Sequence, residues 1–186
     1  MLKGVTGSGK TEVYMHAVEH ALAQGRSAIV LVPEIALAMQ MEKRFQNRFG
    51  AENVAILHSK LTTSKRLENW LRIREGSAKV ILGARTAIFA PVTDLGLVVI
   101  DEEHESTYKS DHNPKYETMD VAYKRAGTFG ATVVLGSATP SVVSFYRASV
   151  GIYHLIELKN RVGKSRLPDV EIEDIRGQVV RGRNEM

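Results

Sequence analysis

Apolar runs alternate with amphipathic segments along the chain, and this alternation predicts the fold class. Six short runs are rich in aliphatic and β-branched residues, and most are apolar at every position rather than at every second one. The predicted strands are residues 28–32, 54–57, 80–82, 97–100, 132–135 and 153–158. Continuous apolar runs are typical of parallel strands, because helices cover both faces of such a sheet.

The segments between these runs repeat their apolar residues with the period of a helix. The predicted helices are residues 11–24, 35–49, 64–74 and 140–149. In the third helix we expect Leu67, Trp70 and Leu71 to point inward. The fourth helix starts with Pro140, and proline is favoured at the first position of a helix. Strands and helices that alternate at this spacing predict an α/β fold with a doubly wound, mainly parallel sheet.

Two stretches depart from the alternation. Residues 106–117 are polar and lack periodicity, so we expect a long loop there. Residues 159–186 begin with a basic run, contain a possible short strand at 170–175, and have no apolar core of their own. We therefore predict one domain over residues 1–158, followed by a linker toward a further domain.

The composition limits the class of protein. With 186 residues, of which 44% are hydrophobic, the chain can bury one full core. It has no apolar run of ~18 residues that could cross a membrane and no secretory signal pattern. The absence of cysteine excludes disulfides and thiolate zinc sites in these residues and favours a cytoplasmic location. A net charge of +4 is compatible with a phosphate-rich partner without requiring one.

A phosphate-binding loop stands near the start of the chain. Residues 4–11 match the pattern G-x-x-x-x-G-K-[ST] in full and directly precede an amphipathic segment, which distinguishes them from a chance glycine-rich turn. The glycines let backbone N–H groups point at a phosphate, and the positive end of the following helix faces the same anion. We expect Lys10 to reach the β- and γ-phosphates and Thr11 to bind Mg²⁺. The residues predicted to bind ATP are Gly4, Thr6, Gly7, Ser8, Gly9, Lys10 and Thr11.

Only residues 1–3 precede the loop, so the strand before it is short and the chain is expected to start inside the sheet.

A cluster of carboxylates follows the apolar run at 97–100. Residues 101–104 read Asp-Glu-Glu-His. Asp-Glu-Glu alone is most often an ordinary acidic turn. After a buried strand in a phosphate-loop protein, however, these carboxylates are where a metal is held. We expect Asp101 to bind Mg²⁺ through water and Glu102 to polarise the attacking water, so the predicted catalytic residues are Lys10, Asp101 and Glu102. His104 is either a coupling residue or a polar loop residue.

The chain resembles superfamily 2 helicases in two further respects. Residues 101–104 are similar to motif II of these enzymes, and Gly-Ser-Ala-Thr-Pro at 136–140 is similar to motif III. The amino-acid sequences of longer segments resemble those of the primosomal replication-restart helicases of the PriA family. The segments that carry this resemblance are residues 4–14, 31–35, 57–59, 83–89, 101–106, 108–109 and 136–141. The resemblance covers essentially the whole chain.

The resemblance implies a RecA-like first motor lobe of a DNA-dependent ATPase that unwinds in the 3′-to-5′ direction at abandoned replication forks. It implies ATP and Mg²⁺ as cofactors, single-stranded or forked DNA as a partner, and contacts with the primosome and with single-strand-binding proteins. Zinc belongs to a cysteine-rich module of the family that these residues do not contain.

Individual residues take their expected roles from the same resemblance. The coupling residues between ATP and DNA would be His104, Ser137 and Thr139. The DNA contacts would be Pro33, Glu34, Gln40, Gly83, Arg85 and Thr86 in motifs Ia and Ib, with Tyr108 and Tyr116 in an aromatic-rich loop. The chain departs from the family pattern at residues 38–39, 113–114 and 117–119.

Several rival interpretations remain open from the sequence. A GTPase would need an Asn/Thr-Lys-x-Asp motif, which is absent, and a small-molecule kinase would leave residues 136–140 unexplained. The chain could also be the nucleotide-binding module of another phosphate-loop NTPase, either a translocase or a kinase. Such a module would be inactive on its own, because its arginine finger comes from elsewhere. His16 and His20 match an inverted zinc-protease motif, but surface histidines are favoured. Trp70 is expected in the core rather than as a base-stacking platform.

Overall fold

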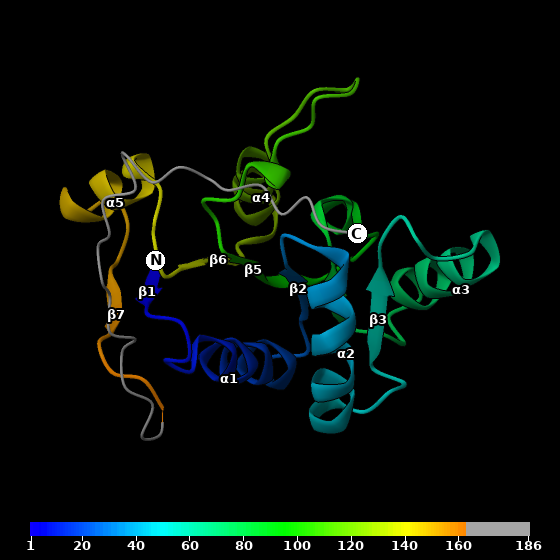
Figure 1. Cartoon of the computed structure of the whole chain (residues 1–186). Helices are drawn as coiled ribbons and strands as arrows, with labels where there is room; N and C mark the ends of the chain where they lie inside the picture. The colour runs from blue at the N-terminus through cyan, green and yellow to red at the C-terminus, as the bar shows by residue number, and fades with distance from the viewer. Residues whose placement is uncertain (163–186) are drawn as a thin grey trace, which may run out of the picture.

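The computed structural model describes residues 1–162 and contains a seven-stranded sheet in which every pairing is parallel (Figure 1). The strand order is β3-β4-β2-β5-β6-β1-β7. The strands are β1 (Leu2–Gly4), β2 (Ser27–Leu31), β3 (Val54–Leu57), β4 (Val80–Gly83), β5 (Leu95–Asp101), β6 (Thr132–Ser137) and β7 (Ile156–Leu158). The doubly wound parallel sheet predicted from the sequence is confirmed.

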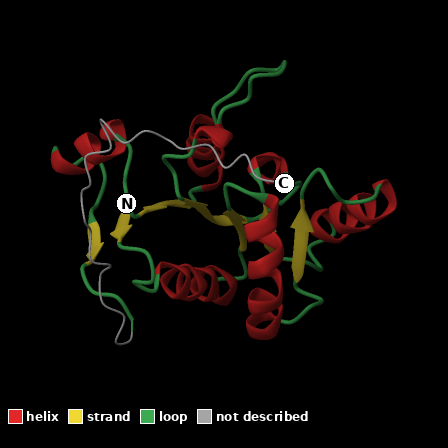
Figure 2. Ribbon diagram, in the orientation of Figure 1, coloured by secondary structure: helices red, strands yellow, loops and turns green. Residues whose placement is uncertain are grey.

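Helices cover both sides of this sheet, as Figure 2 shows. They are α1 (Lys10–Ala23), α2 (Ile35–Phe49), α3 (Thr63–Arg74), α4 (Thr118–Phe129) and α5 (Val142–Ser149), with short 3₁₀ turns η1 (Arg85–Phe89) and η2 (Ser106–Tyr108). On one face, α1 and α2 pack through the buried rings of Tyr14 and Phe45. On the other face, α3, η1 and α4 contribute Ile73, Ile88 and Ala122. None of the helices in the described residues has the length and apolar character that a bilayer crossing requires.

Strand β5 illustrates why the predicted strands are apolar throughout. Val98, Val99 and Ile100 are all fully buried. Val99 belongs to the core under α1 and α2, whereas Val98 and Ile100 belong to the core under α4 and η1. Because successive side chains point to opposite faces and both faces are covered, every position is apolar. Burial of each such side chain stabilises the fold by about 1.5–3 kcal/mol.

Helix α3 departs from its predicted orientation. Its buried residues are Asn69, whose amide donates to the backbone oxygen of Ile56 at 2.9 Å, and Ile73 one turn further on. The expectation that Leu67 and Trp70 point inward was wrong, since they are 56% and 38% exposed. The helix packs beside the edge strand β3, where one narrow stripe is enough to cover the sheet.

The last two elements are shorter than predicted. Helix α5 begins at Val142, and the side chain of Ser141 caps it by accepting a hydrogen bond from the N–H of Ser144. Pro140 therefore precedes the cap and is not the first helical residue. Strand β7 begins only at Ile156, because Tyr153 still belongs to the turn after α5 and donates its N–H to Arg147. The possible strand at 170–175 and most of the predicted linker lie outside the described residues.

Gly136 in β6 tests how tightly α1 packs on the sheet. A Cβ at this position would lie 1.7 Å from the hydroxyl oxygen of Tyr14, whose buried ring has no space to retreat. We expect Gly136→Ala to lower the free energy of unfolding in urea by about 1–3 kcal/mol through overpacking. The matched control is Gly127→Ala in α4, where no atom lies within 4 Å of the added carbon. That variant should gain about 0.5–1 kcal/mol from higher helix propensity. Equal stabilities for the two variants would contradict this packing.

Candidate functional site

The phosphate loop forms the turn between β1 and α1. Gly7 and Gly9 have φ angles of +78° and +89°, a left-handed conformation that residues with a side chain rarely adopt. Lys10 then begins α1, so that the positive end of the helix faces the loop. Together with Asp101 and Glu102, the loop lines a cavity of about 550 Å³.

Strand order brings the phosphate loop and the acidic cluster together. β6 lies between β5 and β1 in the sheet. Asp101 of β5 is paired with Gly136 of β6, and Lys3 of β1 is paired with Ser137. Because the three strands are parallel, their carboxyl ends lie at one edge, where open α/β sheets bind their ligands. The predicted ATP site is thus assembled from three neighbouring strand ends.

Lys10 is folded into the loop. Its side chain is 9% exposed, and its ammonium donates to the backbone oxygen of Gly4 at 2.9 Å. The same Nζ atom lies 3.4 Å from Oε1 of Glu102. Nearby, the hydroxyl of Ser8 is buried without a hydrogen-bond partner in the described residues. A buried cation beside an unsatisfied hydroxyl fits an anionic ligand that would supply the missing acceptors.

Tyr14 positions the carboxylate of Asp101. Its hydroxyl donates to Oδ1 of Asp101 at 2.7 Å from the second turn of α1. Burial, followed by the nearby charge of Asp101, raises the pKa of Tyr14 well above its usual range, so that the phenol stays a donor. Burial also raises the pKa of Asp101, and the Tyr14 hydrogen bond opposes that rise. The sequence pattern does not link Tyr14 with Asp101, because the two residues are 87 positions apart.

The residues near the loop suit a magnesium ion held together with phosphates. Among residues 1–162 there is no group of three or more His, Cys, Asp or Glu side chains arranged to hold a metal alone. Mg²⁺ is usually bound by one or two protein oxygens, with substrate phosphates and water completing the shell. Thr11 and Asp101, which line the same cavity, fit that division of ligands.

Glu102 occupies a strained backbone position. Its φ angle is +47°, and in the described residues no other non-glycine residue has a positive φ. Such conformations cost about 1–3 kcal/mol and concentrate at functional sites. Here the conformation points the carboxylate at Lys10 on one side and, on the other, at the Ser137 hydroxyl and the Ala138 N–H, both 3.4 Å from Oε2. The carboxylate therefore stands between the phosphate loop and the end of β6.

Glu103 has a structural partner that the sequence pattern did not reveal. It is 3% exposed, and its carboxylate accepts hydrogen bonds from the N–H of Ser141 at 2.7 Å and from the hydroxyl of Ser144 at 2.9 Å. A carboxylate at the first turn of a helix satisfies free N–H groups and complements the helix dipole. Glu103 therefore caps α5 and ties it to the acidic cluster.

The three predicted coupling residues lie together. Nδ1 of His104 is 2.8 Å from the hydroxyl oxygen of the buried Ser137, and its Nε2 is 3.4 Å from that of Thr139. The backbone N–H of Thr139 donates to the same Ser137 oxygen at 3.0 Å. Since Ser137 also contacts Glu102, a continuous polar path connects Glu102 with His104.

A second groove of about 500 Å³ runs along the same edge of the sheet, from the end of β2 to η2. Of the predicted DNA contacts, Pro33, Arg85 and Thr86 line it, together with Lys109. Arg85 donates to the backbone oxygens of Thr107 and Lys109. It has no carboxylate partner among the described ion pairs, so its charge remains available to an anion.

Arg85 also lies against the loop that follows η2. Its guanidinium is 5.8 Å from the centre of the Tyr116 ring, which is half-buried. The loop doubles back through a bridge between Lys109 and Glu117, and Figure 1 shows it projecting beyond α4. Tyr116 thus lies at the foot of a projecting loop beside the groove.

Two of the predicted DNA contacts lie buried in this structure. Tyr108 is 3% exposed, and its hydroxyl donates to the backbone oxygen of Asp101 at 2.7 Å, so the ring cannot stack on DNA in this conformation. Gly83 is buried at the end of β4, where a Cβ would lie 2.2 Å from the backbone oxygen of Leu57. Close packing, rather than contact with a ligand, requires glycine there. The burial of Tyr108 could not be predicted from the sequence, because spacing does not reveal that its hydroxyl reaches the end of β5.

The remaining predicted residues lie on the surface. Glu34 precedes α2 and Gln40 lies on it; both are exposed, and neither is among the residues that line the groove. His16 contacts Glu19 at 3.1 Å and His20 contacts Gln24 at 2.9 Å, as expected of surface histidines.

Arg44 of α2 is a cavity residue that the sequence pattern did not single out. It lines the cavity of the phosphate loop and binds Glu12 of α1 at 2.9 Å. Arg48, one turn later, binds Glu12 and also Glu19 at 2.8 Å. The side chains of the two glutamates are 41% and 43% exposed, so these pairs contribute little stability. They place the Arg44 guanidinium at the rim of the cavity.

Comparisons with known proteins agree with this geometry. A family model described as DEAD/DEAH box helicase matches residues 1–146. The chain is 48% identical over 186 residues to the Replication restart protein PriA of Bacillus subtilis, an alignment that covers 100% of the chain and 23% of that protein. It is 48% identical over 172 residues to the same protein of Treponema pallidum, covering 92% of the chain and 26% of that relative. The chain thus spans about a quarter of the length of these relatives, and the resemblance to the PriA family is confirmed.

Solved structures give the same fold. The structure of RecG bound to a three-way DNA junction matches with a TM-score of 0.63 and 26% identity, over 89% of this chain and 21% of that chain. The Hef helicase domain of Pyrococcus furiosus matches with a TM-score of 0.62 and 20% identity, over 85% of this chain and 34% of that chain. The RecA-like fold is confirmed.

Removal of the Glu103 carboxylate should destabilise α5 without altering the phosphate loop. Glu103→Ala leaves the Ser141 N–H and the Ser144 hydroxyl without their acceptor, and we expect it to lower the free energy of unfolding by about 1–3 kcal/mol. The measurement is urea unfolding, with amide hydrogen exchange to locate the loss in residues 142–149. The control is Glu105→Ala, since Glu105 is exposed and close in sequence. Unchanged protection of α5 in Glu103→Ala would contradict the capping role.

Proposed function

The chain belongs to the DEAD/DEAH box helicase family, and from this premise we propose that residues 1–158 form the ATP-binding lobe of an ATP-dependent DNA helicase. The observation that carries the proposal is the 3.4 Å contact between Nζ of Lys10 and the Glu102 carboxylate, in one cavity with Asp101. The helicase would move along single-stranded DNA in the 3′-to-5′ direction and serve replication restart at stalled forks. The relatives' name, Replication restart protein PriA, supports that role. Residues 159–186 would lead to a second lobe.

The phosphate loop and the acidic cluster have proposed parts in ATP hydrolysis. The backbone N–H groups of residues 6–11 and the Lys10 ammonium would bind the phosphates, and Thr11 with Asp101 would hold Mg²⁺. A bound magnesium ion supplies neutralisation of the charge that develops on the phosphates. Tyr14 would keep the Asp101 carboxylate in its orientation through the 2.7 Å hydrogen bond. Glu102 would orient and polarise the attacking water.

Contacts across the end of β6 support a coupling path from ATP to DNA. The Ser137 hydroxyl contacts Glu102 and His104, so that a change in the position of the Glu102 carboxylate alters both hydrogen bonds. Tyr108 provides a second link, because its hydroxyl binds the backbone of Asp101 while its chain neighbour Lys109 lines the groove. We assign coupling to His104, Ser137 and Thr139, with Tyr108 as a positioning residue.

The groove at Arg85 is proposed to bind single-stranded or forked DNA through its phosphates. Arg85 and Lys109 carry positive charge there, against one acidic lining residue, Asp111, and Thr86 offers a hydroxyl. Such groups bind the backbone without reading the bases. Pro33 would shape the groove, and Glu34 and Gln40 would contact DNA only beyond its rim. Primosome proteins and single-strand-binding proteins are the proposed protein partners, by likeness to the relatives.

Replacement of Lys10 tests the ATP site. In a helicase that contains these residues, Lys10→Ala should lower ATP turnover at least about a hundredfold, because the phosphates lose their buried cation, while DNA affinity is retained. The measurements are phosphate release and oligonucleotide binding, with the exposed Lys124→Ala as control. Normal hydrolysis by Lys10→Ala would contradict the site assignment.

The isolated chain should bind ATP weakly and hydrolyse it very slowly, because the arginine finger of such motors is supplied from outside the phosphate-loop lobe. Phosphate transfer to a small-molecule acceptor at a rate that DNA does not change would instead favour a kinase, because kinases share the phosphate loop.

Replacement of Arg85 tests the groove. Arg85→Ala should weaken binding of single-stranded DNA to a similar extent for all sequences, because the lost contact is to a phosphate. It should also reduce the slope of log affinity against log salt concentration by about 0.7. The check is a salt titration with oligonucleotides of different sequence, with Lys124→Ala again as control. A loss confined to particular sequences would contradict a backbone contact.

A further inference from the structure

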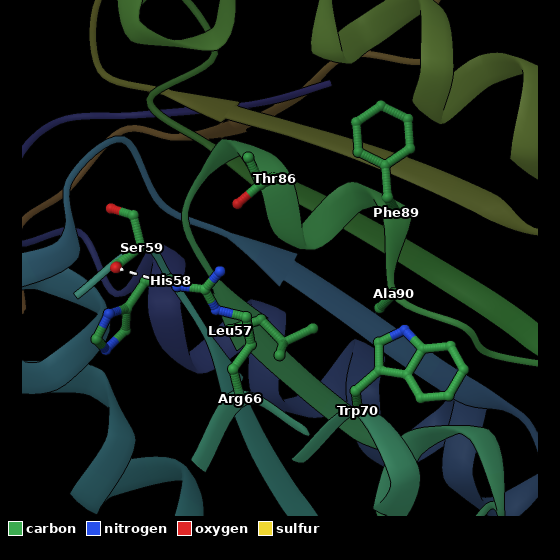
Figure 3. Close-up of a pocket in the computed structure, with 8 residues that line it drawn as sticks. All are labelled: Leu57, His58, Ser59, Arg66, Trp70, Thr86, Phe89 and Ala90. Carbon is green, nitrogen blue, oxygen red and sulfur yellow. Dashed lines mark hydrogen bonds between the residues drawn. The ribbon is translucent and has the colours of Figure 1, made fainter. Parts of the chain in front are cut away.

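A hollow between α3 and η1 is not used by the proposed ATP site. Its volume is about 330 Å³, which lies within the range of about 300–1,000 Å³ of small-molecule sites. The residues that line it are Leu57, His58, Ser59, Arg66, Trp70, Thr86, Phe89 and Ala90 (Figure 3). None of these side chains is acidic.

The hollow adjoins the groove of Arg85. Ser59 and Thr86 line both. Ser59 follows β3, and Thr86 lies in η1 directly after β4, so the shared rim is formed by the ends of two neighbouring strands. A polymer whose backbone lies in the groove would therefore pass the mouth of the hollow.

Trp70 gives the hollow an aromatic wall. It is 38% exposed, because α3 packs on the sheet through Asn69 and Ile73 and leaves the indole outside the core. In Figure 3 the indole lies beneath Ala90. The guanidinium of Arg74 is 4.9 Å from the centre of the indole. An exposed indole in an apolar hollow offers a stacking surface for a planar ligand.

Arg66 provides a cation at the opposite side. Figure 3 shows it pointing from α3 toward Thr86. Its Nη2 atom donates to the backbone oxygens of Ser59 at 3.3 Å and Leu61 at 3.5 Å. Among the ion pairs of residues 1–162, Arg66 has no carboxylate partner. Its charge is therefore balanced only by backbone dipoles, and an anion could bind it.

We propose that this hollow receives one unstacked base of a single-stranded DNA whose phosphates lie in the groove of Arg85. The base would stack on Trp70, and Arg66 would contact a phosphate at the shared rim beside Thr86. The inference rests on the proposed function, because it needs DNA in the groove. It adds a base-holding site, with Trp70 and Arg66 as binding residues, to a surface otherwise expected to contact only the backbone.

The chemistry of the hollow favours a nucleotide over a polypeptide segment. An aromatic ring, an unpaired guanidinium and a hydroxyl are the groups that single-stranded nucleic acid sites combine. Hollow and groove also share residues, so that one continuous strand would fill both. A purely apolar segment would leave Arg66 unmatched.

Fluorescence of the chain tests the proposal directly. The sequence contains one tryptophan, so emission excited at a wavelength that tyrosine does not absorb reports Trp70 alone. At low salt, an oligothymidylate of about 12 nucleotides should quench this emission, and the quenching should saturate with the binding curve measured by anisotropy of the labelled oligonucleotide. An abasic oligonucleotide of the same length should bind through its phosphates and leave the emission unchanged.

Variants then measure the contribution of the ring. Trp70→Ala should weaken oligothymidylate binding about five- to a hundredfold and leave binding of the abasic oligonucleotide unchanged. Trp70→Phe, which keeps a ring, should recover most of the affinity. Tyr146→Ala, which removes an exposed aromatic residue from α5 beyond the opposite edge of the sheet, should have no effect.

Three outcomes would overturn the base site. Binding of oligothymidylate without quenching would show that the hollow does not receive DNA. A polypeptide segment would then be favoured as its occupant. Equal quenching by the abasic oligonucleotide would show that phosphates alone disturb Trp70. If neither oligonucleotide binds, the DNA groove of the proposed function fails, and the base site fails with it. If both bind and only the quenching is missing, the groove stands and the base site alone is rejected.

Discussion

The site depends on one contact between two distant parts of the chain, the pairing of the Lys10 ammonium with the Glu102 carboxylate. The two charges meet because β1 and β5 both lie beside β6 and end at the same edge of a parallel sheet. A sheet with another strand order would leave each group alone, and an unpaired charge as buried as Lys10 is costly. Fold and chemistry are thus coupled, because the arrangement that closes the core also brings a carboxylate to the buried cation.

The four residues of the acidic cluster serve four different partners, although they are consecutive. Asp101 ends a strand and binds Tyr14, and Glu102 turns toward Lys10. Glu103 then points into α5, and His104 reaches the end of β6. This divergence follows from the left-handed turn at Glu102, which interrupts the alternation of the strand. A short motif can therefore join the cavity of the phosphate loop, a helix cap and the neighbouring strand end within one turn of chain.

Much of this arrangement could be predicted from the sequence, because continuous apolar runs identify parallel strands and the loop pattern specifies its own backbone. What could not be predicted depends on partners far along the chain. The hydroxyl of Tyr108 finds a backbone oxygen at the end of β5, so an apparently exposed tyrosine is buried. Helix α3 covers an edge strand through Asn69 and Ile73, and periodicity predicts the wrong face because the buried Asn69 is polar whereas the exposed Trp70 is apolar. No role was predicted for Glu103, because spacing does not disclose that the serine cap of α5 lies in front of its carboxylate.

The backbone at Glu102 sets stability and chemistry against each other at a single position. Glycine would adopt the left-handed turn without strain, and asparagine would adopt it more readily than glutamate. Natural chains retain such strained residues only where selection acts on something other than folding. A library of all substitutions at this position, scored separately for thermal tolerance and for turnover, should therefore rank the amino acids in opposite orders. Such an inversion would show that glutamate is retained at this position for turnover and not for stability.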